Sequence, residues 1–223
     1  MFVSLPTRRR LTPRWATPTL AVVLVLSFIW SQAQPQASLL RDWGALSGGL
    51  AEPQAWRSGA ALRLFTALFL HADWAHLLGN LVFLLVFGLP AERTMGPWRF
   101  LMLFLLGGAV SNLVAGLYIG APERVIIGAS GAVSAVIGAY LALFPGAKLG
   151  VVLPLGLFLE FVKAPAFLLI GAWAALQVLF AYIGPAFGAV AWAAHIAGFV
   201  FGAVFALFVR GAIARRLRRQ KGY

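Results

Sequence analysis

The chain has 223 residues, of which 61% are hydrophobic and only 11% are charged, and its mean hydropathy is +0.89. Soluble domains carry about 25% charged residues, so this chain has too little polar surface to cover a water-soluble globule. Its 18 Lys and Arg against 6 Asp and Glu give a net charge of +12, but the basic residues lie at the ends of long apolar runs. A nucleic-acid binder needs them on one face of a soluble core, which argues against a nucleic-acid partner. The sequence has no cysteine, and therefore no disulfide or cysteine–metal site. We expect an integral membrane protein whose surroundings are the lipid bilayer.

The uncharged runs predict six membrane-spanning helices, since a helix needs about 20 residues to cross about 30 Å of hydrocarbon. The predicted spans are 16–31, 74–90, 100–121, 125–147, 164–183 and 188–209, with a turn at Gly184 and Pro185 before the last. An N-terminal segment (1–15), an outer loop (32–73) of amphipathic composition and a basic tail (210–223) complete the organisation. Residues 149–159 are too short to span and contain Pro154, so we expect an interfacial or re-entrant segment there. The predicted fold class is an all-α membrane protein.

The distribution of positive charge predicts the orientation. With an even number of spans both termini lie on one side, and 14 of the 18 Lys and Arg fall on that side. Cytoplasmic loops carry the excess of positive charge, so both termini are expected to be cytoplasmic. An alternative for the N-terminus is a cleavable signal peptide, because Arg8 to Arg10, an apolar stretch and Ser31-Gln32-Ala33 have its layout.

Polar residues are costly inside a membrane, and several of them lie at the starts of the second, fourth and sixth spans. These three spans run from the outer side to the inner side, so their starts share one layer of the bundle. The residues are His71, His76 and Asn80 near the second start, Ser130 within 128–131 near the fourth, and His195 near the sixth. A histidine within hydrogen-bond reach of a serine is the arrangement by which an imidazole removes a hydroxyl proton.

Small residues predict how closely the fourth and sixth spans approach. In the sixth span the small-residue row is Ala194, Gly198, Gly202 and Ala206, and in the fourth it is Gly131, Ala135 and Ala139. Such rows allow helix backbones to come into van der Waals contact, which would bring His195 toward Ser130.

Each of these residues also has a structural explanation when taken alone. A serine in an apolar helix usually bonds to a carbonyl one turn earlier, and a histidine often bonds to a neighbouring helix. Three histidines could bind a transition metal, but the sequence has no His-Glu-x-x-His string. A transporter needs carboxylates at mid-membrane, whereas all six acids lie in loops or at span ends. A Ser–His pair without an acid is the interpretation that remains, and a metal requirement for activity would favour the histidine–metal alternative instead.

Three motifs resemble those of the rhomboid intramembrane serine proteases, in order and on the second, fourth and sixth helices. They are His71-Ala-Asp-Trp-Ala-His76-Leu-Leu-Gly-Asn80, Gly128-Ala-Ser130-Gly131 and Ala194-His195-Ile-Ala-Gly198-Phe-Val-Phe-Gly202. The resemblance covers about 62–209 and implies a six-helix rhomboid-like bundle that cleaves transmembrane segments of other membrane proteins near their outer ends.

The resemblance also implies roles for individual residues. Ser130 would be the nucleophile and His195 the general base, while His76, Asn80 and the backbone N–H of Ser130 would stabilise the oxyanion. The supporting residues would be His71, Gly128, Gly131, Gly198 and Gly202. No cofactor or metal is implied, and the expected place is a bacterial inner membrane with the active site facing its outer side.

The sequence departs from the family at two positions. Ser134 stands where many members carry an aromatic residue that stacks on the histidine, and Leu62 stands where a tryptophan is common. The alternative function is a non-catalytic rhomboid-like protein that binds membrane clients. Such relatives lack the serine or the histidine, whereas this chain has both.

Overall fold

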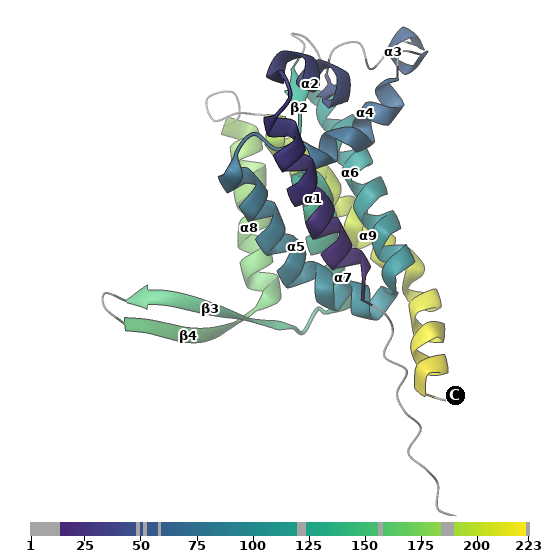
Figure 1. The fold of residues 1–223 in the computed structure, drawn as a ribbon. Coiled ribbons are helices and arrows are strands. Elements are labelled where there is room, and N and C mark those ends of the chain that lie inside the picture. The colour runs from purple at the N-terminus through teal and green to yellow at the C-terminus, as the bar shows by residue number, and fades with distance from the viewer. Residues whose placement is uncertain are drawn as a thin grey trace, which may run out of the picture.

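The computed structural model describes residues 14–47, 50, 53–57, 59–119, 124–155, 158–183 and 190–221. Long helices pack side by side in a bundle, and shorter elements gather at its two ends (Figure 1). Among the described residues the bundle helices are α1 (Ala16–Gln32), α5 (Trp74–Met95), α6 (Pro97–Ile119), α7 (Ser130–Leu143), α8 (Ala166–Ile183) and α9 (Val190–Lys221).

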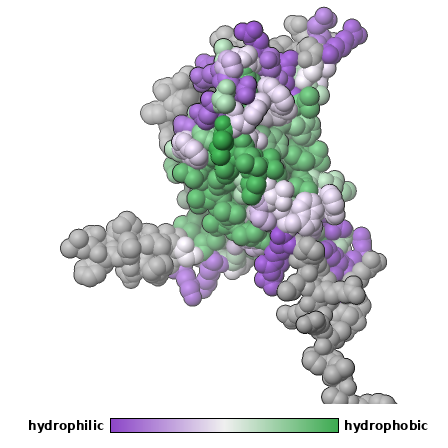
Figure 2. Space-filling model, in the orientation of Figure 1, coloured by the Kyte–Doolittle hydropathy of each residue, from purple (hydrophilic) through white to green (hydrophobic). Residues whose placement is uncertain are grey.

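The surface of the bundle has the polarity of a membrane protein. On the face shown in Figure 2, a hydrophobic belt crosses the middle, and hydrophilic residues are concentrated toward the two ends. In the part of the chain that the structure describes, α5, α6 and the Trp192–Arg218 stretch of α9 are long and apolar enough to cross a membrane, and the other apolar helices are shorter. Large side chains such as Phe208, 88% exposed, face outward from this belt. Several apolar helices of this length indicate a multi-pass membrane protein.

Each predicted span overlaps one helix of the structure, but the ends of the helices differ from the ends of the predicted spans. Helix α5 continues through Pro90 to Met95, and α9 continues through the basic tail to Lys221. Most residues of the tail are Arg, Ala, Leu, Gln or Lys, which have high helix propensity, so the loss of hydrophobicity after 209 does not end the helix. The predicted turn at Gly184 and Pro185 and the first 13 residues lie outside the described part of the chain.

Two short antiparallel pairings make the fold mostly helical rather than all-α. Strand β1 (Ala45–Leu46) pairs with β2 (Val125–Ile126), and β3 (Lys148–Leu155) pairs with β4 (Phe158–Pro165). Because 125–126 are extended, the helix within the predicted span 125–147 begins only at Ser130. The hairpin takes the place of the expected interfacial or re-entrant segment. Strand pairing satisfies the backbone of an apolar segment that is too short to cross a bilayer.

The predicted outer loop folds into short elements that cover one end of the bundle (Figure 1). They are α2 (Gln36–Trp43), β1, α3 (Pro53–Arg57), α4 (Ala60–Thr66) and the 3₁₀ turn η1 (Ala67–Phe69). Helices α5, α7 and α9 all begin at this end.

A buried carboxylate joins the start of α1 to the end of α5. The two carboxylate oxygens of Glu92 accept the backbone N–H groups of Ala16 and Thr17, each at 2.8 Å. At the same end of the bundle the Arg216 guanidinium of α9 donates to the carbonyl of Thr94 at 3.0 Å. The start of α1 and the end of α9 therefore lie at one end of the bundle.

Helix α7 is the centre of the bundle. Its residues 131–140 are all buried, and at 14 residues it is about 21 Å long. Its backbone touches that of α9: a Cβ on Gly202 would collide with the carbonyl oxygen of Ala135, and one on Gly138 with that of Phe199. Glycine is therefore required for the two helices to lie this close.

Candidate active site

The turn before Ser130 is shaped by Gly128. This residue has φ +109°, a left-handed conformation that side chains disfavour, and its N–H donates to the carbonyl of Ala67 at 2.9 Å. A Cβ at this position would lie 2.6 Å from the Cε1 and Nε2 atoms of His76, so the imidazole rests against the glycine backbone. The conformation and the contact both require glycine here.

Helix α5 positions His76 and Asn80 on one face. The Asp73 carboxylate accepts the N–H of His76 at 2.7 Å and caps the helix, which fixes where its first turn begins. Asn80 follows four residues later and its side chain is buried. Within the described part of the chain, its Nδ2 has no hydrogen-bond partner. A buried amide donor without a partner is available to an incoming oxygen.

Close backbone packing positions His195. A Cβ on Gly198 would collide with the carbonyl oxygen of Gly131 and would lie 2.6 Å from the Ser111 hydroxyl of α6. Helices α7 and α9 therefore touch at the residue directly after Ser130 and one turn beyond His195. The small-residue rows expected from the sequence lie face to face, so these two side chains enter the same space.

That space is a cavity of about 230 Å³ near the end of the bundle that α2 and α4 cover. Its walls come from α5, α7, α8 and α9. The lining residues are Ala75, His76, Gly79, Asn80, Phe83, Ser130, Val133, Ser134, Ile137, Trp173 and His195. Apolar side chains make up most of the wall, and the polar groups are few and convergent, as in most small binding sites.

His71 lies beside the cavity rather than in its lining. Its Nε2 accepts the N–H of Ala129 at 3.5 Å, and its ring meets that of His76 edge-on at 5.0 Å between centroids. His71 precedes α5, and burial, followed by the nearby His76, lowers its pKa from 6.5 to about 4. It is therefore neutral at pH 7 and holds the residue before Ser130.

Trp173 of α8 is a lining residue that the sequence analysis missed. Its ring centroid is 6.4 Å from that of His195 with the planes 31° apart, and Trp192 lies edge-on to His195 at 6.0 Å. Ser134 instead turns its hydroxyl back to the carbonyl of Ser130, at 2.7 Å. The aromatic neighbour absent at 134 is thus supplied from another helix. No sequence signal could have found it, because tryptophans abound in this chain and the contact spans 22 residues of sequence.

The structure brings together four of the polar residues chosen from the sequence, Ser130, His195, His76 and Asn80, in one cavity. The supporting glycines chosen from the sequence all lie at close contacts: Gly198 and Gly202 against the backbone of α7, Gly128 against the His76 side chain and Gly131 against the Ser111 side chain. Their chemical roles stay predictions. In the described residues no three His, Asp or Glu side chains gather as a metal site would require.

Comparison with known proteins gives consistent matches. The model of the rhomboid domain matches residues 54–212. Rhomboid-related protein 1 of Caenorhabditis elegans is 30% identical over 164 residues, covering 68% of this chain and 40% of the relative. Rhomboid-like protease 3 of Toxoplasma gondii is 33% identical over 129 residues, covering 57% and 46%. RHOMBOID-like protein 5 of Arabidopsis thaliana is 34% identical over 108 residues, covering 48% and 33%. The chain thus spans about a third to a half of the length of these relatives.

Proposed function

Because the chain belongs to the rhomboid family, whose domain it matches over 54–212, we propose that it is an intramembrane serine endopeptidase. Its substrates are transmembrane segments of other membrane proteins, cleaved near their outer ends. The observation that carries the proposal is the single cavity lined by Ser130, His195, His76 and Asn80.

In this proposal His195 activates Ser130. The Ser130 Oγ attacks the scissile carbonyl carbon while His195 accepts the hydroxyl proton. The C–N bond then breaks, His195 returns the proton to the leaving amine, and an ester remains on Ser130. A water molecule attacks this ester with His195 again as base, which releases the carboxylate and restores the serine. No metal or cofactor takes part in these steps.

The negative oxygen that forms on the carbonyl needs donors fixed in place. The N–H of Ser130 belongs to the first turn of α7, where backbone N–H groups lack helical acceptors and the helix dipole is positive. The unpartnered Nδ2 of Asn80 and the His76 imidazole complete the set. Each such donor typically contributes a factor of about 10²–10³ in rate.

We also propose that the six bundle helices within 16–209 all cross a bacterial inner membrane and that 1–15 and 210–223 are cytoplasmic. The excess of Lys and Arg at the end where α1 starts and α9 ends supports this orientation. In this orientation the cavity lies near the outer side of the membrane.

Cleavage by the purified full chain tests the proposal. Reconstituted with a model transmembrane substrate, the protein is expected to produce two fragments, and Ser130→Ala and His195→Ala to abolish them without loss of thermal stability. Ser134→Ala is the matched control one turn away, and we expect its rate to stay within about ten-fold of the parent because its hydroxyl only bonds back to the helix.

A fluorophosphonate reagent separates the two candidate functions. A protease is expected to be labelled at Ser130, with labelling lost in His195→Ala. A client-binding protein would bind the substrate helix, leave it intact and resist the reagent. Full cleavage by Ser130→Ala would overturn the mechanism.

A further inference from the structure

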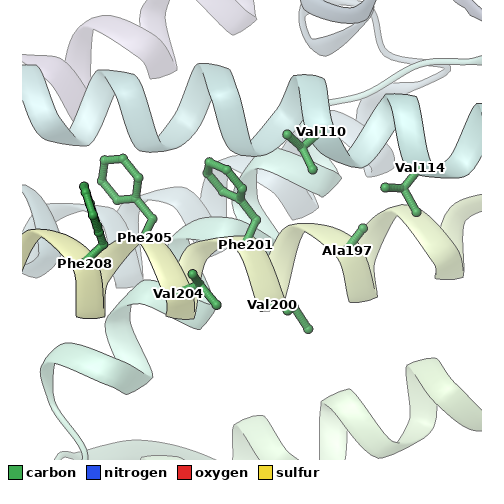
Figure 3. Close-up of a pocket in the computed structure, with 8 residues that line it drawn as sticks. All are labelled: Val110, Val114, Ala197, Val200, Phe201, Val204, Phe205 and Phe208. Atoms are coloured by element: carbon green, nitrogen blue, oxygen red, sulfur yellow. The ribbon is translucent and has the colours of Figure 1, made fainter.

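A second hollow lies away from the candidate active site, on the apolar belt between α6 and α9. It has a volume of about 620 Å³ and apolar walls throughout. Figure 3 shows Val110 and Val114 of α6 on the side of α9 toward which Ala197, Phe201, Phe205 and Phe208 point, while Val200 and Val204 complete the lining from the other side of α9. None of these residues lines the cavity that holds Ser130.

The groove has the length of one lipid leaflet. Residues 197–208 rise about 16 Å along α9, and half of a 30 Å hydrocarbon layer is about 15 Å. The groove ends at Phe208, next to the basic tail of the same helix. Its depth and position fit an acyl chain of the leaflet at the basic end of the bundle.

Arginines continue the groove beyond its apolar end. Arg215 follows Phe208 by seven residues and Arg216 follows Phe205 by eleven, so each lies on the same row of α9 as its apolar predecessor. Arg216 lies over Gly96 at the start of α6, close enough to Arg99 for the two charges to repel each other. Arg99 and Arg216 therefore lie together at the basic end of the α6–α9 seam, and Arg215 follows on the groove's own row of α9.

The described acidic side chains nearest in sequence or space are engaged elsewhere. Glu92 is buried against the start of α1, and its oxygens accept two backbone N–H groups there. Asp42 and Asp73 belong to the opposite end, on α2 and before α5. Arg99 and Arg216 donate instead to backbone carbonyls at the end of α5, and a phosphate group would supply them with a full negative charge.

We propose that the seam between α6 and α9 is a binding site for an anionic phospholipid. The acyl chain of the lipid fills the apolar groove. The phosphate, and a further anionic or hydroxyl group of the same headgroup, accept hydrogen bonds from Arg99, Arg215 and Arg216. Basic pockets between membrane helices have this chemistry, and each arginine near the surface typically adds about five-fold to anionic lipid affinity.

Lipid retention by the full chain tests the site without reference to catalysis. The protein is purified in a nonionic detergent, and native mass spectrometry measures binding of dioleoyl phosphatidylglycerol and dioleoyl phosphatidylcholine, which share their acyl chains. We expect phosphatidylglycerol to bind about ten-fold or more tightly than phosphatidylcholine. Equal binding of the two lipids would overturn the proposal.

The arginines are tested one at a time. Arg215→Gln and Arg216→Gln are each expected to weaken phosphatidylglycerol binding about five-fold and to leave phosphatidylcholine unchanged. Arg210→Gln removes the same charge from a different side of α9 and should leave the preference intact. Arg216 also bonds to the carbonyl of Thr94, so the exposed Arg215 decides the matter if Arg216→Gln fails to fold. Phosphatidylglycerol binding by Arg215→Gln that equals binding by the parent chain would contradict the site.

The groove is tested by filling it. Val200→Trp is expected to reduce retention of both lipids, whereas Leu207→Trp, at a position equally exposed (53% against 54%) but outside the lining, should not. Inorganic phosphate distinguishes a lipid site from a phosphate site. If phosphate alone raised thermal stability as much as phosphatidylglycerol, the acyl part of the proposal would be wrong.

Discussion

His71, Gly128 and Ala129 hold the backbone that leads into Ser130. The His71 imidazole accepts the Ala129 N–H through Nε2, and the residue next to it adopts a left-handed conformation against His76. A protonated imidazole has no free acceptor, so the hydrogen bond to Ala129 exists only while His71 is neutral. The serine's position is thus linked to the protonation state of a histidine outside the spanning helices.

We expect this link to make stability depend on pH. Burial lowers the pKa of His71 to about 4 from 6.5, so below pH 6.5 the unfolded chain takes up a proton before the native one does. The free energy of unfolding should fall between pH 6.5 and 4, by up to about 3 kcal/mol, and stay unaffected by this group above pH 7.

Thermal unfolding at pH 7 and pH 4.5 measures the effect. His71→Gln keeps an acceptor but does not titrate, and its stability should change less between the two pH values than that of the parent chain. An identical pH dependence in both proteins would show that His71 titrates as it does in the unfolded chain.

The residue scale also shows what sequence reasoning could and could not find. His76 and Asn80 share a face because they are four apart, a relation that any helix enforces. Trp173 depends on where α8 packs, which no local pattern encodes. The same holds for Gly128: its sequence context suggests a turn, but only the contact with His76 explains why glycine is needed.

At the scale of elements, α7 and α9 are joined backbone to backbone. Gly138, Gly198 and Gly202 each remove a side chain that would separate the two helices. Since α7 carries Ser130 and α9 carries His195, the same contacts that stabilise the bundle set the separation of the proposed catalytic pair.

Gly202→Ala tests this arrangement. Its Cβ would meet the carbonyl of Ala135, so we expect a loss of about 1–3 kcal/mol in stability and a fall in cleavage of about 10²-fold from a shift of His195. Gly211→Ala, further along α9, meets only the Nη1 of Arg215 at 3.8 Å and should leave both measurements close to those of the parent. If Gly202→Ala cleaved the substrate as fast as the parent chain, the contact between α7 and α9 at this position would not control the placement of His195.

Hydropathy located the helices well and their ends poorly. An apolar run reports that a segment avoids water, but not which partner takes its backbone hydrogen bonds. Val125 and Ile126 are apolar enough to extend a helix, yet they pair with a strand from the first loop. The hairpin of β3 and β4 is a second example: each strand supplies the backbone hydrogen-bond partners of the other, which in a helix would come from the same segment.

For the whole molecule, the uneven distribution of charge is the main clue to orientation. The start of α1 and the end of α9 meet at one end, next to the arginines of α5, α6 and α9. The parity of the spans and the positive-inside rule came from the sequence alone. Together they predicted that the polar residues of three helices would share a layer, which is where the cavity lies.

Labelling of introduced cysteines tests the orientation, because the chain has none of its own. Ala37→Cys on α2 and Leu217→Cys on α9 are both exposed and lie at opposite ends. In intact spheroplasts a membrane-impermeant maleimide should label position 37 alone, and in inverted vesicles position 217 alone. The reverse labelling pattern would show that the proposed orientation is wrong and that the cavity opens toward the cytoplasmic side.

The short length of α7 would set the depth of Ser130 in the membrane of the proposed enzyme. The helix is about 21 Å long, so in the proposed orientation, with its C-terminal end at the cytoplasmic surface, Ser130 would lie about 9 Å short of the far side of a 30 Å hydrocarbon layer. In a substrate helix anchored at the same membrane surface, only the peptide bonds at the depth of Ser130 would lie within its reach. The site of cleavage would then depend on how far a bond lies from the surface as well as on the residues around it.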